Sequence, residues 1–183
     1  MKILPVFIVG VILLAGCRES NDTSERIPDA EAPELIANAL PFHQIQVREK
    51  LFYAPNTQSP YSGWVKYMWD NGQVQMLKYV KDGVATGPTT SWYESGEKKA
   101  EGRVKNNFDD GLVVFWHRNG QKAAERTYDE GNPVGLWQEW FDNGQKMSER
   151  RYSESGEKVG IWREWYKNGK LAREGARRYQ HGK

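Results

Sequence analysis

The sequence predicts an all-β protein, an antiparallel array of β-hairpin repeats that forms one long twisted or coiled meander sheet. A motif of about 24 residues recurs five times, and each copy contains Asn-Gly or Ser-Gly between two runs rich in aromatic residues. Aromatic residues make up 13% of the chain, with eight Trp, and such large rings favour strands over helices. Only 38% of residues are hydrophobic, so burial must depend on these rings.

The first 16 residues are expected to be a signal peptide. Lys2 precedes an apolar run from Ile3 to Leu14, which is shorter than the about 20 residues that span a bilayer. The segment Leu13-Leu14-Ala15-Gly16-Cys17 resembles the lipobox of bacterial lipoproteins. That resemblance implies cleavage before Cys17 and acylation of its sulfur and new amino group, which would make a lasting membrane anchor. The alternative is an ordinary secretory signal in which the cysteine stands by chance.

Residues 17–41 are predicted to be the acylated cysteine and a flexible tether. Residues 18–41 are rich in acidic residues and proline and contain no aromatic side chain. Such a composition buries too little apolar surface to offset chain entropy. A short helix over residues 32–40 is an alternative for part of this segment.

Residues 42–175 are predicted to be the repeat domain, with about five hairpin repeats. A second glycine stands nine positions before each turn glycine. The turn glycines, which are spaced by 24, 24, 24 and 25 residues, are Gly72, Gly96, Gly120, Gly144 and Gly169.

Each Asn-Gly pair is expected to form a two-residue type I′ turn, since both residues tolerate positive φ. This register places Trp140 opposite Met147 in the fourth copy. In the last copy it places Arg163 opposite Glu174 and Glu164 opposite Arg173. Since one hairpin is marginal in water, the copies must pack side by side, with rings on both faces of the sheet.

The repeat pattern resembles a known family. The pattern G-x-W-x-E-W-[YF]-x-N-G-x-x-x-x-E resembles the MORN-repeat variant family, often called YwqK-like antitoxin-type, over roughly Leu51 to Gly175. The antitoxin label implies a protein partner. The family is defined by structural positions, so the resemblance implies no catalytic chemistry.

A search for enzyme signatures predicts no catalytic residue, metal site or cofactor. His43, His117 and His181 have no metal-ligand spacing, and His117 occupies a ring position of the repeat. A recurrent acid follows each turn except the first and is interpreted as an exposed charge that blunts the sheet. These acids are Glu101, Glu125, Glu149 and Glu174.

Three tryptophans outside the regular ring column, Trp64, Trp137 and Trp162, are the candidate binding surface. Exposed rings would suit stacking on peptidoglycan or another cell-wall glycan, whereas rings at fixed repeat positions are more often core. The basic C-terminal tail, residues 176–183, is interpreted as a solvated cap or a contact for anionic lipid or an acidic partner. A net charge of +2 and an export signal exclude nucleic acid as the expected partner.

Together these patterns predict a non-enzymatic repeat lipoprotein of the bacterial cell envelope, lipid-anchored to a membrane. In a Gram-negative cell this is the outer membrane, on its periplasmic side or at the surface. The expected role is protein binding or scaffolding, antitoxin- or immunity-like. The alternative role is peptidoglycan binding through exposed aromatic rings.

Overall fold

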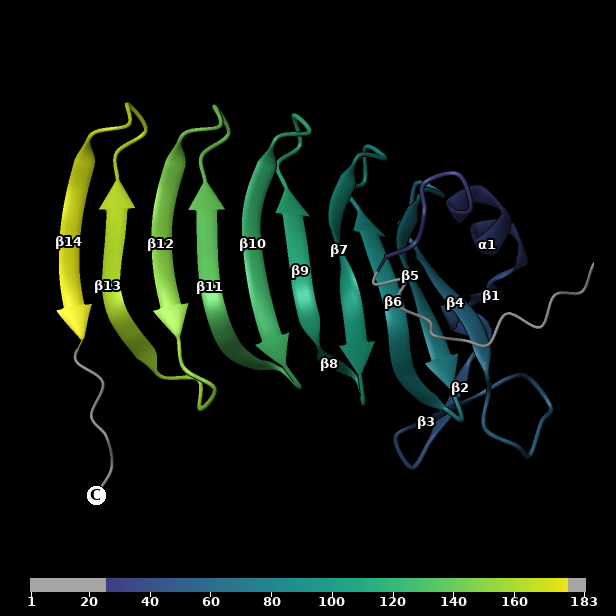
Figure 1. Cartoon of the computed structure of the whole chain (residues 1–183). Helices are drawn as coiled ribbons and strands as arrows, with labels where there is room; N and C mark the ends of the chain where they lie inside the picture. The colour runs from purple at the N-terminus through teal and green to yellow at the C-terminus, as the bar shows by residue number, and fades with distance from the viewer. Residues whose placement is uncertain (1–25, 178–183) are drawn as a thin grey trace, which may run out of the picture.

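The computed structural model describes residues 26–177, and most of them lie in β-strands (Figure 1). Twelve strands form one open sheet in the order β1-β4-β5-β6-β7-β9-β10-β11-β12-β13-β14, and β8 pairs with β7. Neighbouring strands are antiparallel except β1, which pairs parallel to β4. The prediction of an antiparallel hairpin array in one long sheet is therefore confirmed.

Five hairpins follow one another along this sheet, each inclined to the next (Figure 1). They are β4 (Gly63–Met68) with β5 (Val74–Lys81), β6 (Val84–Trp92) with β7 (Lys98–Lys105), β9 (Gly111–Trp116) with β10 (Lys122–Asp129), β11 (Asn132–Trp140) with β12 (Lys146–Tyr152), and β13 (Lys158–Trp165) with β14 (Leu171–Arg177). The remaining elements are α1 (Ala32–Asn38), β1 (Leu40–Pro41), the 3-10 helix η1 (Phe42–Gln44), β2 (Gln46–Arg48), β3 (Leu51–Tyr53) and β8 (Phe108–Asp109).

The Asn-Gly turns differ from the expected type I′ geometry. In the fourth hairpin the N–H of Phe141 donates to the carbonyl of Gln145, and the N–H of Gly144 donates to the carbonyl of Phe141. The loop therefore has three residues, of which Gly144 has a positive φ of 79° and Asn143 does not. This is the pattern of a tight turn followed by a left-handed residue, and all five hairpins share it.

A β-bulge after each turn restores the expected register. Trp140 lies opposite Lys146 rather than Met147, but the next pair is Glu139 with Ser148, so Met147 is the extra residue. The pairing expected between Trp140 and Met147 is thus wrong, because a three-residue loop shifts the register by one and the bulge shifts it back. Beyond the bulge the last hairpin has the expected pairs, Arg163 with Glu174 and Glu164 with Arg173.

Type I′ turns occur instead at the opposite end of the sheet, between hairpins. Asp82 and Gly83 have φ of 50° and 82°, and they join the facing residues Lys81 and Val84. Asn106-Asn107 and Glu130-Gly131 also have positive φ at both positions. Three of the four linkers, rather than the Asn-Gly pairs, therefore carry the turn that matches the strand twist. The fourth linker, from Ser153 to Glu157, repeats the three-residue loop of the Asn-Gly ends.

Two rows of cross-strand neighbours define the two faces of the sheet, because facing residues point to the same side. Face A is the side of the row Lys66, Leu77, Thr90, Glu101, Val114, Glu125, Gln138, Glu149, Arg163 and Glu174. Face B is the side of the row Tyr67, Met76, Ser91, Ala100, Phe115, Ala124, Glu139, Ser148, Glu164 and Arg173.

The segment before the first hairpin folds onto face A. Ile27 and Ala39 are buried against Leu77, and α1 packs on the same cluster. Lys66 Nζ donates to the carbonyl of Ile36 at 2.8 Å, near the end of the helix. The expected flexible tether is therefore wrong for residues 26–41, because a few apolar side chains suffice once the sheet offers a surface. Part of the alternative helix is present as α1.

The buried apolar residues lie in the first three hairpins, and the first hairpin has cover on both faces. On face B, Phe42 of η1 stacks on Tyr67 with ring centroids 4.3 Å apart, and Phe52 of β3 lies beside it. Val65, Leu77 and Val80 are fully buried between these layers. Within residues 26–177, no buried hydrophobic residue lies beyond Ala124. The last two hairpins thus form a single-layer sheet.

The expected signal peptide and Cys17 lie outside the described residues. Within residues 26–177 no helix is long and apolar enough to cross a membrane.

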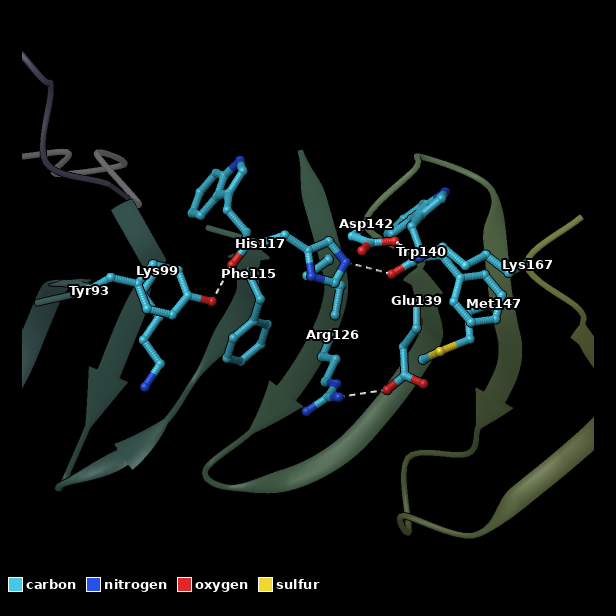
Figure 2. A pocket seen from close by; sticks show the side chains of 14 residues that line it. Tyr93, Lys99, Phe115, His117, Arg126, Glu139, Trp140, Asp142, Met147 and Lys167 are labelled. Atoms are coloured by element: carbon cyan, nitrogen blue, oxygen red, sulfur yellow. Dashed lines mark hydrogen bonds and ion pairs between the residues drawn. The ribbon is translucent and has the colours of Figure 1, made fainter. Parts of the chain in front are cut away.

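Side-chain hydrogen bonds connect each hairpin to the next at the Asn-Gly end. Asn119 Nδ2 donates to the carbonyl of Asp142 at 2.6 Å, and Asn143 Nδ2 donates to that of Lys167 at 2.9 Å. The ring residues before the second and third turns do the same, since Tyr93 Oη donates to the carbonyl of Trp116 and His117 Nε2 to that of Trp140, both at 2.8 Å (Figure 2). We call these contacts the inter-hairpin bonds.

Phe141 interrupts this row, because its ring has no donor. Replacing Phe141 by tyrosine should add one inter-hairpin bond to the carbonyl of Trp165, and should raise the free energy of unfolding by about 0.5–1.5 kcal/mol. Urea unfolding would measure the change. Tyr93→Phe is the matched control and should lower stability by a similar amount. A loss of stability in Phe141→Tyr would contradict this geometry.

Candidate functional site

One hollow of the molecule lies on face B, where the third and fourth hairpins meet (Figure 2). It has a volume of about 520 Å³. Phe115, Phe141 and Met147 supply apolar lining, and Arg126 and Glu139 supply paired charges. We call it the face B hollow.

The β-bulges aim side chains into this hollow. Lys99, Ala123 and Met147 are the extra residues of the second, third and fourth hairpins, and all three line it. A bulge redirects its extra side chain and increases the local twist. Three neighbouring hairpins therefore each place one variable side chain along the same hollow.

An alternating row of charges runs along face B from the hollow. Arg126 Nη2 lies 2.6 Å from Glu139 Oε1, and Arg150 bridges from Glu139 at 3.5 Å to Glu164 at 3.1 Å. Ser148 Oγ also donates to Glu139 Oε2 at 2.8 Å. These contacts fix the carboxylate of Glu139, whose side chain is only 12% exposed, between two guanidinium groups.

The electrostatics of Glu139 follow from these neighbours. Burial disfavours its charged form, but hydrogen bonds from Ser148 and Arg126 outweigh burial and hold the pKa of Glu139 below its usual value. Arg126 also lies over the rings of Phe115 and Trp137, at 5.1 and 5.3 Å from their centroids. Its Nε is buried and has no hydrogen-bond partner within residues 26–177.

A second hollow of about 300 Å³ adjoins the first, and Phe115 lines both. Lys78 lies at its edge over the rings of Phe52 and Tyr67, and burial lowers the pKa of Lys78. Burial also raises the pKa of Asp109 in the same hollow. Face B therefore offers two adjoining hollows across several strands, with apolar walls and a few charges.

Face A carries a regular ladder of lysine, tryptophan and glutamate. Lys122, for example, bonds Glu125 at 2.5 Å and lies over the ring of Trp140 at 5.5 Å. Lys98 and Lys146 repeat this arrangement. The acids were expected to be exposed, but Glu101 is 6% exposed because Arg26 and Lys98 bind it.

The three candidate tryptophans do not form one surface. Trp64 lies on face A, packs against the N-terminal cluster and meets Tyr79 edge-on. Trp137 and Trp162 lie on face B, since they stand one repeat position later than Trp64. Trp137 is held between Tyr128 and Tyr152, at 5.0 and 4.8 Å. All three rings are half-buried.

The turn glycines and the histidines have structural surroundings. The five turn glycines have φ between 79° and 98°. His117 donates its Nε2–H to a backbone carbonyl, whereas His43 is exposed in η1 and His181 lies outside the described residues. No group of three potential metal ligands occurs in the described part of the chain.

Comparison with known proteins identifies the repeat. Residues 109–130, 133–156 and 158–175 match the MORN repeat variant family. No curated protein matches the sequence. One solved structure, a crystal structure of a GtfA/B complex bound to UDP and GlcNAc, is 13% identical, with a TM-score of 0.26. The match covers 75% of this chain and 26% of that one, and a score of this size does not indicate a shared overall fold.

The matched stretches coincide with the third, fourth and fifth hairpins, and the first two hairpins have the same turn and bulge. The match indicates a repeat protein with a binding or scaffold role. The three stretches that are similar to the MORN repeat variant thus lie within a five-hairpin array.

Proposed function

We propose that this protein is a non-enzymatic, lipid-anchored scaffold of the bacterial cell envelope that binds a protein partner through the face B hollow. The observation that carries the proposal is the hollow itself, where aromatic, methionine and arginine side chains meet on a face left uncovered by the described residues. Aromatic residues, Met and Arg are the types enriched at protein interfaces. A lipobox-like segment ending at Cys17 supports the envelope location.

The charges of the hollow favour recognition over catalysis. Glu139 is held between two guanidinium groups and accepts from Ser148, so its low pKa suits a fixed anion rather than a general acid. Asp142, at the rim, is bound by Lys167, which holds the pKa of Asp142 below its usual value. These paired charges would define the orientation of a partner.

Antitoxin- or immunity-like activity is the narrower version of this proposal, with a toxin-like protein as the partner. Peptidoglycan binding is the alternative. Glycan binding would need the rings of Trp137 and Trp162 to be accessible on face B. Two tyrosine rings already contact the ring of Trp137. Quenching of tryptophan fluorescence by soluble muropeptides would support the alternative.

The test is a crosslinking pull-down from intact envelopes with the full chain. Ala123→Glu puts a charge into the apolar wall of the hollow, so we expect about tenfold less of a dominant protein partner, equivalent to about 1.4 kcal/mol. Gln75→Glu is the matched control, because Gln75 is the bulge residue of the first hairpin and lies outside the hollow. The control should keep the partner.

Cys17→Ala tests the anchor in the same experiment. We expect this variant to leave the membrane fraction and to recover less partner. Unchanged membrane association would contradict lipid anchoring. Recovery of cell-wall fragments without a stoichiometric protein would contradict the protein-binding role and support the glycan alternative.

A further inference from the structure

The last hairpin exposes large apolar side chains at the end of the sheet. Ile161, Tyr166 and Leu171 are 51%, 60% and 52% exposed. Within residues 26–177, β14 has a paired strand on one side only (Figure 1). The equivalent ring residues before the other four turns are half-buried, because the next hairpin covers them.

This hairpin does not have the composition of a polar cap. Leu171 stands opposite Trp165, where Lys98, Lys122 and Lys146 stand opposite their own tryptophans. A terminal repeat that ends an array in water needs a polar outer face. The substitution of leucine for lysine makes this end more apolar, as an interaction surface requires.

The donors that connect earlier hairpins are present here without acceptors. Tyr166 and Asn168 occupy the positions of Tyr93 and Asn143, which donate to the following hairpin. Asn168 Oδ1 accepts from the N–H of Lys170, but its Nδ2 and the Tyr166 hydroxyl have no acceptor within residues 26–177. By analogy with Tyr93 and Asn143, Tyr166 is positioned to bind the last residue of a further strand, and Asn168 the second residue after that strand.

The charges of β14 determine which charges a further strand must carry to pair with its outer edge. Arg173 lies on face B and Glu174 on face A. On the side of β14 that is already paired, Glu164 of β13 faces Arg173 and Arg163 faces Glu174. Arg163 Nε lies 2.6 Å from Glu174 Oε2. A second strand would match these charges with an acid and a base in the same order.

A second copy of β14 is a poor fit. Antiparallel strands related by a two-fold axis place one residue opposite its own copy. In the central registers this residue is Arg173 or Glu174, so like charges would face each other. The complement is therefore a strand whose sequence differs from that of β14.

We propose that the outer edge of β14 binds an extended segment of a partner protein as an added strand, with a basic residue opposite Glu174 and an acidic residue opposite Arg173. Backbone hydrogen bonds would supply affinity, and the two charges would select the register. This inference rests on the proposed protein-binding role and adds a second contact, away from the face B hollow.

The probe is a fluorescent peptide with the sequence of residues 158–167, KVGIWREWYK, which carries the required Arg-Glu pair and ends at the residue whose carbonyl accepts from Asn143. Fluorescence anisotropy would measure its binding to the full chain. In the control peptide the Arg and Glu are exchanged, which turns two attractive pairs into repulsive ones. We expect the control to bind about tenfold more weakly, equivalent to about 1.4 kcal/mol.

Two variants of the protein test the edge itself. Asn168→Asp keeps the acceptor that Lys170 uses and removes the free donor, and Tyr166→Phe removes the hydroxyl. Each should weaken peptide binding about three- to tenfold with an unchanged unfolding midpoint. Ala123→Glu should bind the peptide normally, so a failure here is distinguishable from a failure of the hollow.

Absence of peptide binding would overturn the proposal, including the case in which residues outside the described part occupy the edge. Equal affinity for both peptides would overturn the charge register that the proposal requires.

Discussion

Replacing Leu77 by alanine is expected to lower the free energy of unfolding by about 2–5 kcal/mol, the largest effect of any single change considered. Leu77 is fully buried on face A, where Ile27 and Ala39 cover it. The loss combines the transfer of the removed methyl groups with a cavity that α1 and the strand backbone cannot fill. Chemical unfolding followed by tryptophan fluorescence would measure it.

Leu171→Ala is the control for this prediction. It removes the same atoms from a side chain that is 52% exposed, so stability should change by about 0.5 kcal/mol or less. Equal losses in the two variants would contradict a core confined to the first hairpins and their N-terminal cover.

Glu139→Gln is expected to cost about 1–3 kcal/mol, the second largest effect. The amide keeps the shape of the side chain but leaves Arg126 and Arg150 without the carboxylate between them. This expected loss of stability is smaller than the loss from breaking a fully buried ion pair, because both arginine side chains remain partly exposed. Glu174→Gln, which changes an exposed pair with Arg163, should cost about 0–1 kcal/mol.

The same variant should change the response to acid. The pKa of Glu139 is lower in the folded state than its ordinary value, so its stabilising effect is present above the unfolded pKa and is lost as pH falls through the folded one. The wild type should therefore lose stability below about pH 4.5, and Glu139→Gln should lose less over that range. Parallel pH curves for the two proteins would contradict this role of Glu139.

The repeat geometry was largely predictable from sequence, because glycine spacing reports the period directly. The turn type was not. A two-residue turn and a three-residue loop followed by a bulge give the same pairs further along the strand, as Arg163 with Glu174 illustrates. The pattern of apolar and charged residues is therefore satisfied by both, and only backbone geometry distinguishes them.

The N-terminal cover could not be predicted from its own composition. Ile27 and Leu35 belong to an acidic, proline-containing segment, and their apolar cluster is completed by Leu77 and two tryptophans of the folded sheet. The sequence does contain the information that Trp64 and Trp137 point to opposite faces, because Trp64 stands eight positions before its turn glycine and Trp137 stands seven. In a strand a shift of one residue moves a side chain to the other face.

The inter-hairpin bonds had a signal in the sequence that was missed. The residue before each loop is Trp69, Tyr93 or His117 in the first three copies, and each has a ring donor. The face B hollow had no such signal. It depends on bulges that bring Lys99, Ala123 and Met147 together from three hairpins.

Site-specific photocrosslinking in intact cells tests the central claim, that face B binds a protein partner, most directly. A photoreactive phenylalanine analogue would be placed at position 123, inside the hollow, or at position 75, the equivalent bulge outside it. Our account predicts one discrete protein adduct from position 123 and none from position 75. Adducts of equal yield from both positions, or none from either, would contradict it.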